Sequence, residues 1–445
     1  MNINDEFETI SAIATPLGTG GVGIVRVSGS TAFDIALKMF SKSKIDPGII
    51  NHGWVTDNGQ KIDEVILLPF QNPNSYTGED VVEFQCHGGP NVVKKILDLT
   101  IKNGARLAQR GEFTKRAFLN KKLDLSQAEA VLDLIHAKTD NFVQKSANNL
   151  SGALKKEISA IKSSLFSLYS RIIAAVDFPE DVAEPEYSFL KTEMENTVTK
   201  IDKILKNANA SNIMRQGIKI AIVGCPNAGK SSLFNALLNL DRAIVTEIPG
   251  TTRDIIQESI DIDGIPATLI DTAGIRDKNK VDKVEAIGIE YTQNCVQNAD
   301  LILFLFDWSK GFDENDALIY ELIENKPHIK IASKADLAEV PNPEALNISS
   351  KTGYNIEELK DKIKDTVLDK DSMETEFVTN KRQQECLTNA RKALVNALIA
   401  TENGEIQDLI SIDIKSALLA LDEITGEVIT DEILENIFEH FCIGK

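Results

Sequence analysis

The chain has 445 residues, of which 42% are hydrophobic and 26% charged, and its net charge is −19 at pH 7. This length predicts two to four domains of ordinary globular composition. The negative charge argues against strong unaided nucleic-acid binding, since neutralisation of phosphates supplies most of that affinity. No segment approaches the roughly 18 consecutive apolar residues of a membrane span, and the acidic N-terminus is unlike a signal peptide. We therefore expect a cytoplasmic protein without membrane contact.

The cysteines give a second indication of the compartment. They are scattered, their number is odd, and no C-x-x-C pair occurs. This usage indicates a reducing environment and argues against a disulfide framework or a structural zinc site. The five positions are Cys86, Cys225, Cys295, Cys386 and Cys442.

Residues 1 to about 120 alternate short apolar runs with helical stretches, a pattern typical of an α+β domain. The segment Gly18–Gly23 fits G-x-G-x-x-G literally, the pattern of dinucleotide-binding loops. In this chain the glycines precede a strand rather than open a helix, and Pro16 lies in the approach. We therefore predict a tight loop between two strands instead of a dinucleotide site.

The stretch from residue 94 to residue 122 is positively charged, in contrast to the negative net charge of the whole chain. It holds nine Lys and Arg residues and only Asp98 and Glu112 as acids. A solvated helix face is the preferred interpretation of such a pattern, and an RNA-facing patch is the alternative.

From about residue 121 the apolar spacing becomes helical. Ser126–Glu129 fits a capping box, and apolar residues from Leu150 to Ile172 recur at three- and four-residue spacing, which predicts one long helix. An acidic turn at Asp177–Glu186 ends it. Helical spacing resumes from Leu190 and again after Val367. Neither helical portion can bury its apolar face alone, so we predict one all-α domain, residues 121–213 and 371–445, with a domain of residues 214–370 inserted into it.

The inserted segment contains Gly224–Ser231, which fits G-x-x-x-x-G-K-[ST], the loop that wraps nucleotide phosphates. An apolar strand pattern precedes it and a helical pattern follows. Glycines let backbone N–H groups approach the phosphates, and the helix N-terminus adds positive potential. We predict that Lys230 reaches the β- and γ-phosphates and that Ser231 ligates Mg²⁺. Further nucleotide contacts are expected from Asn227, Ala228, Gly229 and Ser232.

Three more motifs follow strand patterns in the order typical of a Ras-like α/β GTPase. The first is a D-x-x-G motif, the second reads guanine through Asp336, and the third offers a backbone N–H to guanine O6. Ser333 replaces the usual Asn of the second motif, so we expect a lower affinity for the base. The predicted contacts are Asp271, Thr272, Ala273, Gly274, Ser333, Lys334, Ala335, Asp336, Ser349, Ser350 and Lys351.

Catalysis needs a group other than the usual glutamine, because Ile275 occupies that position after D-x-x-G. A monovalent cation held by the Asn227 side chain and by carbonyls of the following loop is one possibility. Arg253 and Arg276 are rival candidates for charge stabilisation, although solvated charge is the preferred interpretation of both. Glu285 is a candidate for orienting water, although its spacing alone favours an exposed helix carboxylate. Thr252 is the predicted second Mg²⁺ ligand. The loop's expected nucleotide contacts are Thr246, Glu247, Ile248, Pro249, Gly250, Thr251 and Thr252.

Several segments together resemble the MnmE (TrmE) family of bacterial tRNA-modification GTPases over essentially the whole chain. They are IATPLGTGGVGIVRVSG, NSYTGEDVVEFQCHGGP, RGEFTKRAFLNKKLDLSQAEAVLDLI, GTTRD, DTAG with a following aliphatic residue, and the terminal FCIGK. The resemblance implies that residues 1–120 form a folate-binding and dimerisation domain. It also implies a homodimer that joins the flavoprotein MnmG in a heterotetramer and attaches an aminomethyl or carboxymethylaminomethyl group to carbon 5 of the wobble uridine of certain tRNAs.

The resemblance also implies ligands for particular residues. GTP, Mg²⁺, K⁺ and 5-formyl-tetrahydrofolate, or another tetrahydrofolate, would be the cofactors. Potassium would be held by Asn227, Thr246, Ile248 and Thr251. The folate would be held by Arg26, Glu83, Lys122 and Lys445. Glu285 would act in catalysis with Lys230 and Thr252. A ribosome-assembly GTPase switch is the alternative function, and folate binding by residues 1–120 would argue against it.

Overall fold

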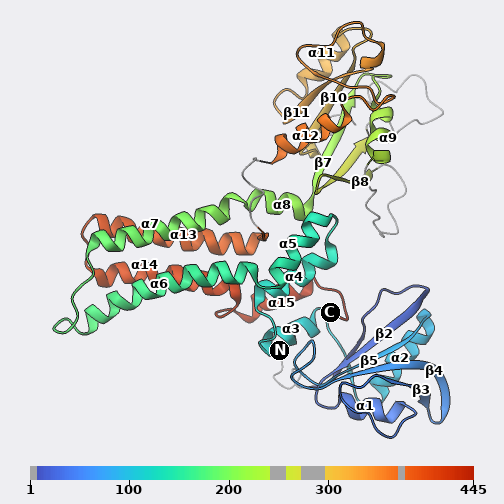
Figure 1. The fold of residues 1–445 in the computed structure, drawn as a ribbon, viewed down its shortest axis with the longest axis vertical. Coiled ribbons are helices and arrows are strands. Elements are labelled where there is room, and N and C mark those ends of the chain that lie inside the picture. The colour runs from blue at the N-terminus through green and yellow to red at the C-terminus, as the bar shows by residue number, and fades with distance from the viewer. Residues whose placement is uncertain (1–7, 241–256, 272–295, 369–375) are drawn as a thin grey trace. The chain divides into compact units, whose positions relative to one another are not determined.

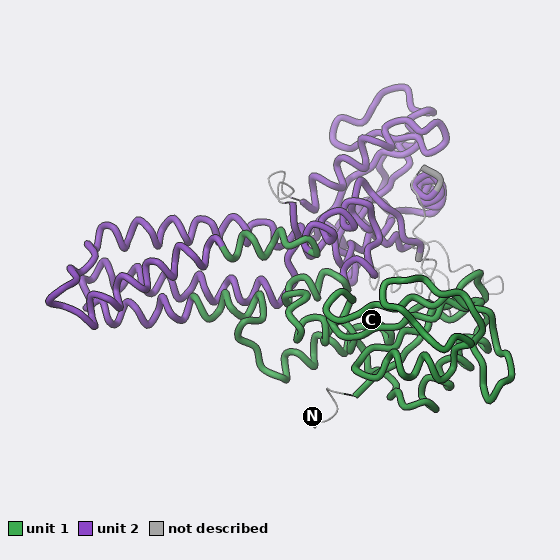
Figure 2. The backbone as a smooth tube through the Cα atoms, turned by 60° about the horizontal axis from the view of Figure 1, so that its bottom comes forward, with its two compact units in different colours: residues 1–132, 150–159, 418–445 green, residues 133–149, 160–417 purple. Residues whose placement is uncertain are grey.

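The computed structural model describes residues 8–240, 257–271, 296–368 and 376–445. The chain divides into two compact units (Figure 2). The first contains residues 1–132, 150–159 and 418–445, and the second contains residues 133–149 and 160–417. Among the described helices, none combines the length and the apolarity that crossing a bilayer requires.

The first unit contains a six-stranded sheet with the order β3-β4-β5-β2-β1-β6, in which only the β1–β6 pair is parallel. Helices α1 (Ala32–Met39) and α2 (Pro90–Lys102) bury their apolar residues in a common core with the sheet. The strands are β1 (Ile10–Ile13), β2 (Gly20–Ser28), β3 (Asn51–Asp57), β4 (Gln60–Phe70), β5 (Val81–Gly88) and β6 (Arg106–Leu107). The expected α+β class is confirmed. Gly18 and Thr19 lie in the β1–β2 connection, but Gly20–Gly23 already belong to β2, which pairs with β5, so the predicted loop is wrong for these four residues.

The basic stretch is only partly a solvated face. Arg116, on helix α3 (Glu112–Leu119), is 4% exposed and donates to Glu112 at 2.9 Å and to Glu79 at 3.1 Å. Arg106 donates to Glu112 at 2.6 Å and to Glu8 at 2.9 Å. These two guanidinium groups are therefore committed to ion pairs that hold α3 against the sheet.

Helix α4 (Leu125–His136) begins one residue before Ser126, the first residue of the predicted capping box. Asp124 accepts from the Gln127 N–H at 3.0 Å, and the Gln127 side chain accepts from the Asp124 N–H at 3.0 Å. The box therefore joins Asp124 to Gln127, and the predicted pair of Ser126 and Glu129 is wrong. Aspartate is as good an N-cap as serine. The sequence pattern alone was therefore compatible with a helix capped by either Asp124 or Ser126.

The predicted long helix from Leu150 is also interrupted. Leu150 ends α5 (Asp140–Leu150), and α6 (Ala153–Asp177) begins after Gly152, whose φ of 97° is outside the helical range. From Leu154 to Ile172 the predicted apolar face is buried in α6. The acidic turn ends α6 as expected, and α7 (Tyr187–Lys206) follows it.

Helices from both sides of the inserted domain pack together in the second unit. Helix α7 lies along α13 (Lys381–Glu402), and α6 and α14 (Gln407–Thr425) run in the same bundle (Figure 1). Two shorter helices complete the helical part, α8 (Ala208–Gln216) in this unit and α15 (Asp431–Glu439) in the first. The multidomain class with an inserted α/β domain is thus confirmed.

The inserted domain is a six-stranded sheet with the order β12-β11-β10-β7-β9-β8, in which only β8 is antiparallel. Apolar clusters cover both faces of the sheet, which explains why β10 is buried at every position. The strands are β7 (Ile218–Gly224), β8 (Gln257–Ile262), β9 (Ile265–Asp271), β10 (Leu301–Asp307), β11 (His328–Ser333) and β12 (Leu346–Asn347). The helices are α9 (Lys230–Leu240), α11 (Glu314–Glu321), the 3₁₀ turn η2 (Ala335–Leu337) and α12 (Ile356–Val367).

Candidate functional site

The carboxyl ends of the five parallel strands meet at one edge of the inserted sheet, where open α/β sheets bind ligands. The residues that end these strands are Gly224, Asp271, Asp307, Ser333 and Asn347. Asp271 pairs in register with Ile222, two residues before the end of β7. Topology therefore brings the predicted motifs together, although they are spread over more than a hundred residues of sequence.

The phosphate loop between β7 and α9 has a backbone that few residues tolerate. Gly224 has φ 156°, and a Cβ built there would lie 2.1 Å from the carbonyl oxygen of Leu305. Asn227 and Gly229 have φ of 64° and 99°. A left-handed backbone conformation costs glycine little strain and is tolerated by asparagine. The residues of the loop therefore suit the turn that it forms.

Lys230 lies across this loop. Its Nζ donates to the carbonyl oxygens of Gly224 at 2.7 Å and Cys225 at 2.9 Å. The ammonium is thus held at the mouth of the loop, at the first residue of α9, where the positive end of the helix dipole also lies. Ser231 and Ser232 are exposed in the same first turn. This arrangement concentrates positive charge and hydroxyl oxygens at the mouth of the loop, which are the groups that the predicted phosphate and Mg²⁺ contacts require.

Ser333 has a role that the sequence did not predict. Its hydroxyl is buried at the end of β11 and lies 2.6 Å from the carbonyl oxygen of Ala228 and 2.9 Å from that of Phe306. The residue of the base-reading motif therefore ties the phosphate loop to the neighbouring strands. One hydroxyl donates one hydrogen at a time, so it serves these two acceptors in alternation.

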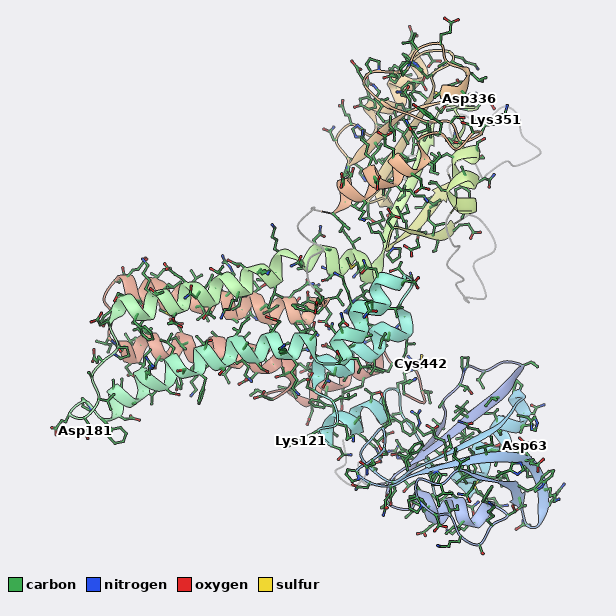
Figure 3. All side chains as sticks on the ribbon, viewed as in Figure 1. Asp63, Lys121, Asp181, Asp336, Lys351 and Cys442 are labelled. Carbon is green, nitrogen blue, oxygen red and sulfur yellow. The ribbon has the colours of Figure 1, made fainter. Side chains whose placement is uncertain are left out.

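Asp307 and Lys334 organise the sheet edge that holds the predicted base-reading motif. Lys334 has φ 57°, and its Nζ donates to Asp307 at 2.6 Å. Burial disfavours the charged carboxylate, but hydrogen bonds from Lys334 and Ser309 outweigh it and lower the pKa of Asp307. The Ala335 N–H donates to Ile348 O at 3.0 Å. That bond joins the loop of Asp336 to the loop of Ser349, Ser350 and Lys351 (Figure 3).

Asp336 is exposed and lies in η2, so its carboxylate is accessible to a base at this edge. Ser349 is 1% exposed, and its hydroxyl accepts from the Thr352 N–H at 3.3 Å. The structure therefore brings together the loop, Ser333–Asp336 and Ser349–Lys351. Asp307 was missed by sequence reasoning because it belongs to no motif, although, like Asp271, it ends an apolar strand.

Other predicted residues lie outside the described residues. They are Thr246, Glu247, Ile248, Pro249, Gly250, Thr251, Thr252, Arg253, Thr272, Ala273, Gly274, Ile275, Arg276 and Glu285. Asp271 is described only through its backbone position at the end of β9.

The cysteine in the phosphate loop is not a nucleophile. Burial, and then the nearby Asp316 carboxylate, raise the pKa of the Cys225 thiol to about 12. At neutral pH the side chain is a neutral thiol, and the thiolate is the reactive form of cysteine.

A second cluster lies in the first unit, on the paired strands β2 and β5. Arg26 and Glu83 are register partners, and Arg26 Nε donates to Glu83 at 2.7 Å. The Arg26 guanidinium lies 5.3 Å from the ring centre of Tyr76 and 5.5 Å from that of Phe113. The two aromatic residues were not predicted, although both fall within segments that carry the family resemblance.

The C-terminal tail ends in this cluster. The carbonyl oxygen of Lys445 accepts from the Phe113 N–H at 3.2 Å, and Arg26 donates to the carbonyl oxygen of Gly444 at 3.4 Å. Burial, and then the positive charge of Arg26, lower the pKa of Lys445. The structure thus brings Lys445 to Arg26 and Glu83. Lys122 is exposed and donates to the Pro73 carbonyl oxygen at 2.9 Å.

Comparisons with known proteins agree with this geometry. The family model described as the MnmE helical domain matches residues 125–442, and the model described as the GTP-binding protein TrmE N-terminus matches residues 9–122. The tRNA modification GTPase MnmE of Thermotoga petrophila is 42% identical over 98% of this chain and 100% of its own length. That of Clostridioides difficile is 42% identical over 98% of this chain and 99% of its own.

Among solved structures, a Tyr→Ala variant of Aquifex aeolicus Era bound to GDP and AlF₄⁻ is similar to part of this chain. It is 28% identical, covers 40% of this chain and 66% of its own, and gives a TM-score of 0.28.

We predict that Ser333→Ala weakens GTP binding by roughly fivefold, because the Ala228 carbonyl loses a hydrogen bond worth about 1 kcal/mol. Equilibrium titration with a fluorescent GTP analogue measures the change. Ser211→Ala is the matched control, since Ser211 is also buried, but its hydroxyl donates to the carbonyl oxygen of Asn207 at 3.0 Å and accepts from the Thr379 N–H at 3.2 Å, outside the phosphate loop. Equal affinities for both variants would remove the role assigned to Ser333.

Proposed function

The chain belongs to the MnmE family of tRNA modification GTPases, and from this premise we propose the reaction that it serves. It hydrolyses GTP in the course of tRNA modification. The proposed modification is a carboxymethylaminomethyl or aminomethyl group on carbon 5 of the wobble uridine of certain tRNAs. The observation that carries this proposal is the full-length similarity together with the charged cluster at Arg26, which a GTPase switch alone does not need.

The residues of the phosphate loop account for the hydrolytic part. Lys230 and the N-terminus of α9 would hold the phosphates and withdraw charge from them as the terminal bond breaks. Ser231, with Thr252, would hold Mg²⁺, which supplies further charge neutralisation when bound. The exposed hydroxyl of Ser231 in the first turn of α9 fits that ligand type. Glu285 is proposed to orient the attacking water.

A monovalent cation is proposed to replace the missing glutamine and arginine finger. Asn227 is exposed on the left-handed turn of the loop, and its side chain has no hydrogen-bonding partner among the described residues. Its amide oxygen is a ligand type that suits K⁺. Carbonyls of Thr246, Ile248 and Thr251 would complete the set.

We predict that Asn227→Ala and Asn227→Gly both abolish the stimulation of GTP hydrolysis by K⁺. Glycine tolerates the positive φ of this position, so it separates loss of the ligand from backbone strain. Initial rates in matched K⁺ and Na⁺ buffers measure the effect. Equal rates of the parent chain in the two salts would refute the ion site.

A tetrahydrofolate is proposed to bind at Arg26, Glu83, Lys122 and Lys445. The residues present fit such a ligand. Glu83 can accept from pterin N–H groups, Lys445 and Arg26 suit carboxylates, and the rings of Tyr76 and Phe113 flank the site. When bound, the cofactor supplies the one-carbon unit, whereas this chain's residues bind and orient it.

We predict that Glu83→Gln lowers the affinity for 5-formyl-tetrahydrofolate by about tenfold or more, because hydrogen bonds to a charged group are worth about 1.5–3 kcal/mol. Isothermal titration calorimetry measures this. Asp57→Asn is the control, since Asp57 is a carboxylate of the same domain that pairs with Lys102 at 2.7 Å. A dissociation constant that Glu83→Gln leaves unchanged would contradict the site.

The proposed partners are a second copy of the chain, the MnmG flavoprotein in a heterotetramer, and tRNA, in the cytoplasm. A ribosome-assembly switch is the rival function, and the Arg26 cluster favours modification over it.

Nucleoside analysis of tRNA tests the function directly. We predict that cells lacking this gene lose the modified wobble uridine, and that the parent gene restores it. A Lys230→Ala gene should fail to restore it, because the phosphates lose their main cation. A normal uridine modification profile in the deleted strain would disprove the proposed reaction.

A further inference from the structure

A groove opens at the end of the helical bundle, where α6 ends and α7 begins. Its volume is about 720 Å³, a size that accommodates several side chains. Figure 3 marks the turn beside it at Asp181. The groove is lined by Phe166, Ser170 and Arg171 of α6, Val182 and Pro185 of the turn, and Phe189 of α7.

Aromatic side chains are unusually exposed around this groove. Of the five exposed phenylalanines among the described residues, Phe166 (61% exposed) and Phe189 (38%) line the groove, and Phe178 (60%) lies in the turn that borders it. Burying one such side chain is worth about 1.5–3 kcal/mol, so leaving three in water forgoes considerable stability. Grouped exposure of this kind is typical of an interaction site.

The turn beside the groove is held by its own backbone. The Phe178 N–H donates to Ala174 O at 3.0 Å, and the Val182 N–H donates to Phe178 O at 2.9 Å. The Arg171 guanidinium lies 5.2 Å from the ring centre of Phe189. These contacts hold the backbone at Phe178 and the ring of Phe189, which lowers the ordering entropy that opposes binding.

The rim of the groove is strongly acidic. Residues 177–186 contain five carboxylates and no Lys or Arg, and all five acids are exposed. Four of them form no ion pair with any described residue: Asp177, Glu180, Asp181 and Glu184. Among the described residues that line the groove, Arg171 is the only cation. The surface therefore combines an apolar floor with an uncompensated negative rim.

We propose that this groove docks a protein partner that inserts an apolar side chain flanked by Lys and Arg residues. The apolar anchor would cover the phenylalanines, and the basic flanks would meet the free carboxylates, which gives both affinity and orientation. Nucleic acid is the wrong occupant, because its phosphates would face five carboxylates. A second copy bound through this same groove is also disfavoured, since two acidic rims would then face each other.

The test uses the full chain and the purified flavoprotein encoded by the same genome. The choice of this partner rests on the proposed function. The chemistry inferred for the groove is independent of the proposed function. Phe166→Ser and Phe178→Ser should each weaken binding by about tenfold or more. Replacing Glu180 and Asp181 by lysine should weaken it further and remove much of its salt dependence. Biolayer interferometry at two salt concentrations measures both effects.

Ile412→Ser is the control, since Ile412 is 57% exposed on α14 and does not line the groove. It should bind as the parent does. Binding that survives the phenylalanine and charge changes would overturn the proposal, as would a loss confined to tRNA binding.

If the parent chain itself fails to bind the flavoprotein, the proposed partner is wrong and the groove is judged separately. The probes are then a peptide with phenylalanine between lysines and the same peptide with glutamates in place of lysines. Preference for the lysine peptide that is lost in Phe166→Ser supports the proposal. Equal binding of the two peptides, or none, overturns it.

Discussion

The nucleotide site depends on how closely the loop after β7 approaches strand β10. At Gly224 any side chain would collide with the backbone of Leu305, so the loop backbone is pressed against the sheet before a ligand arrives. Ser333 fixes the other side of the loop through Ala228. Because both restraints come from buried strands, the N–H groups of the loop are preorganised for charge, which is the main source of electrostatic stabilisation in such sites.

The first unit has a comparable restraint in its C-terminal tail. A Cβ at Gly444 would lie 2.2 Å from the carbonyl oxygen of Ile13, and the φ of this residue is 98°. Only glycine passes there easily. The tail can therefore reach Arg26 and place Lys445 beside Glu83. Residues more than 400 positions apart in the chain thus build one cluster. The short C-terminal motif therefore contributes to this cluster along with strands β2 and β5.

Sequence reasoning succeeded where a motif carries its own backbone geometry. The glycines and Asn227 predicted the phosphate loop because few other residues take those φ values. It failed where several residues satisfy the same rule, as at Asp124 and Ser126, or where a periodic pattern hid a break, as at Gly152. Roles set by tertiary contact were not accessible at all. Ser333 looked like a weakened base contact, and only the folded sheet places its hydroxyl on the Ala228 carbonyl.

The distribution of charge connects these observations. A chain of net charge −19 gains little from the phosphates of tRNA, and in its basic stretch Arg106 and Arg116 already neutralise Glu112 and its neighbours. If the proposed partner carries a basic surface, it would supply much of the affinity for the RNA substrate. The groove beside Phe166 independently favours a partner with basic and apolar side chains. Its carboxylates would pair with the basic groups, and its exposed rings would be buried by the apolar ones. A single partner with a basic surface and an apolar anchor would therefore do two things. It would bring the RNA to this chain, and it would bind the groove at the end of the helical bundle.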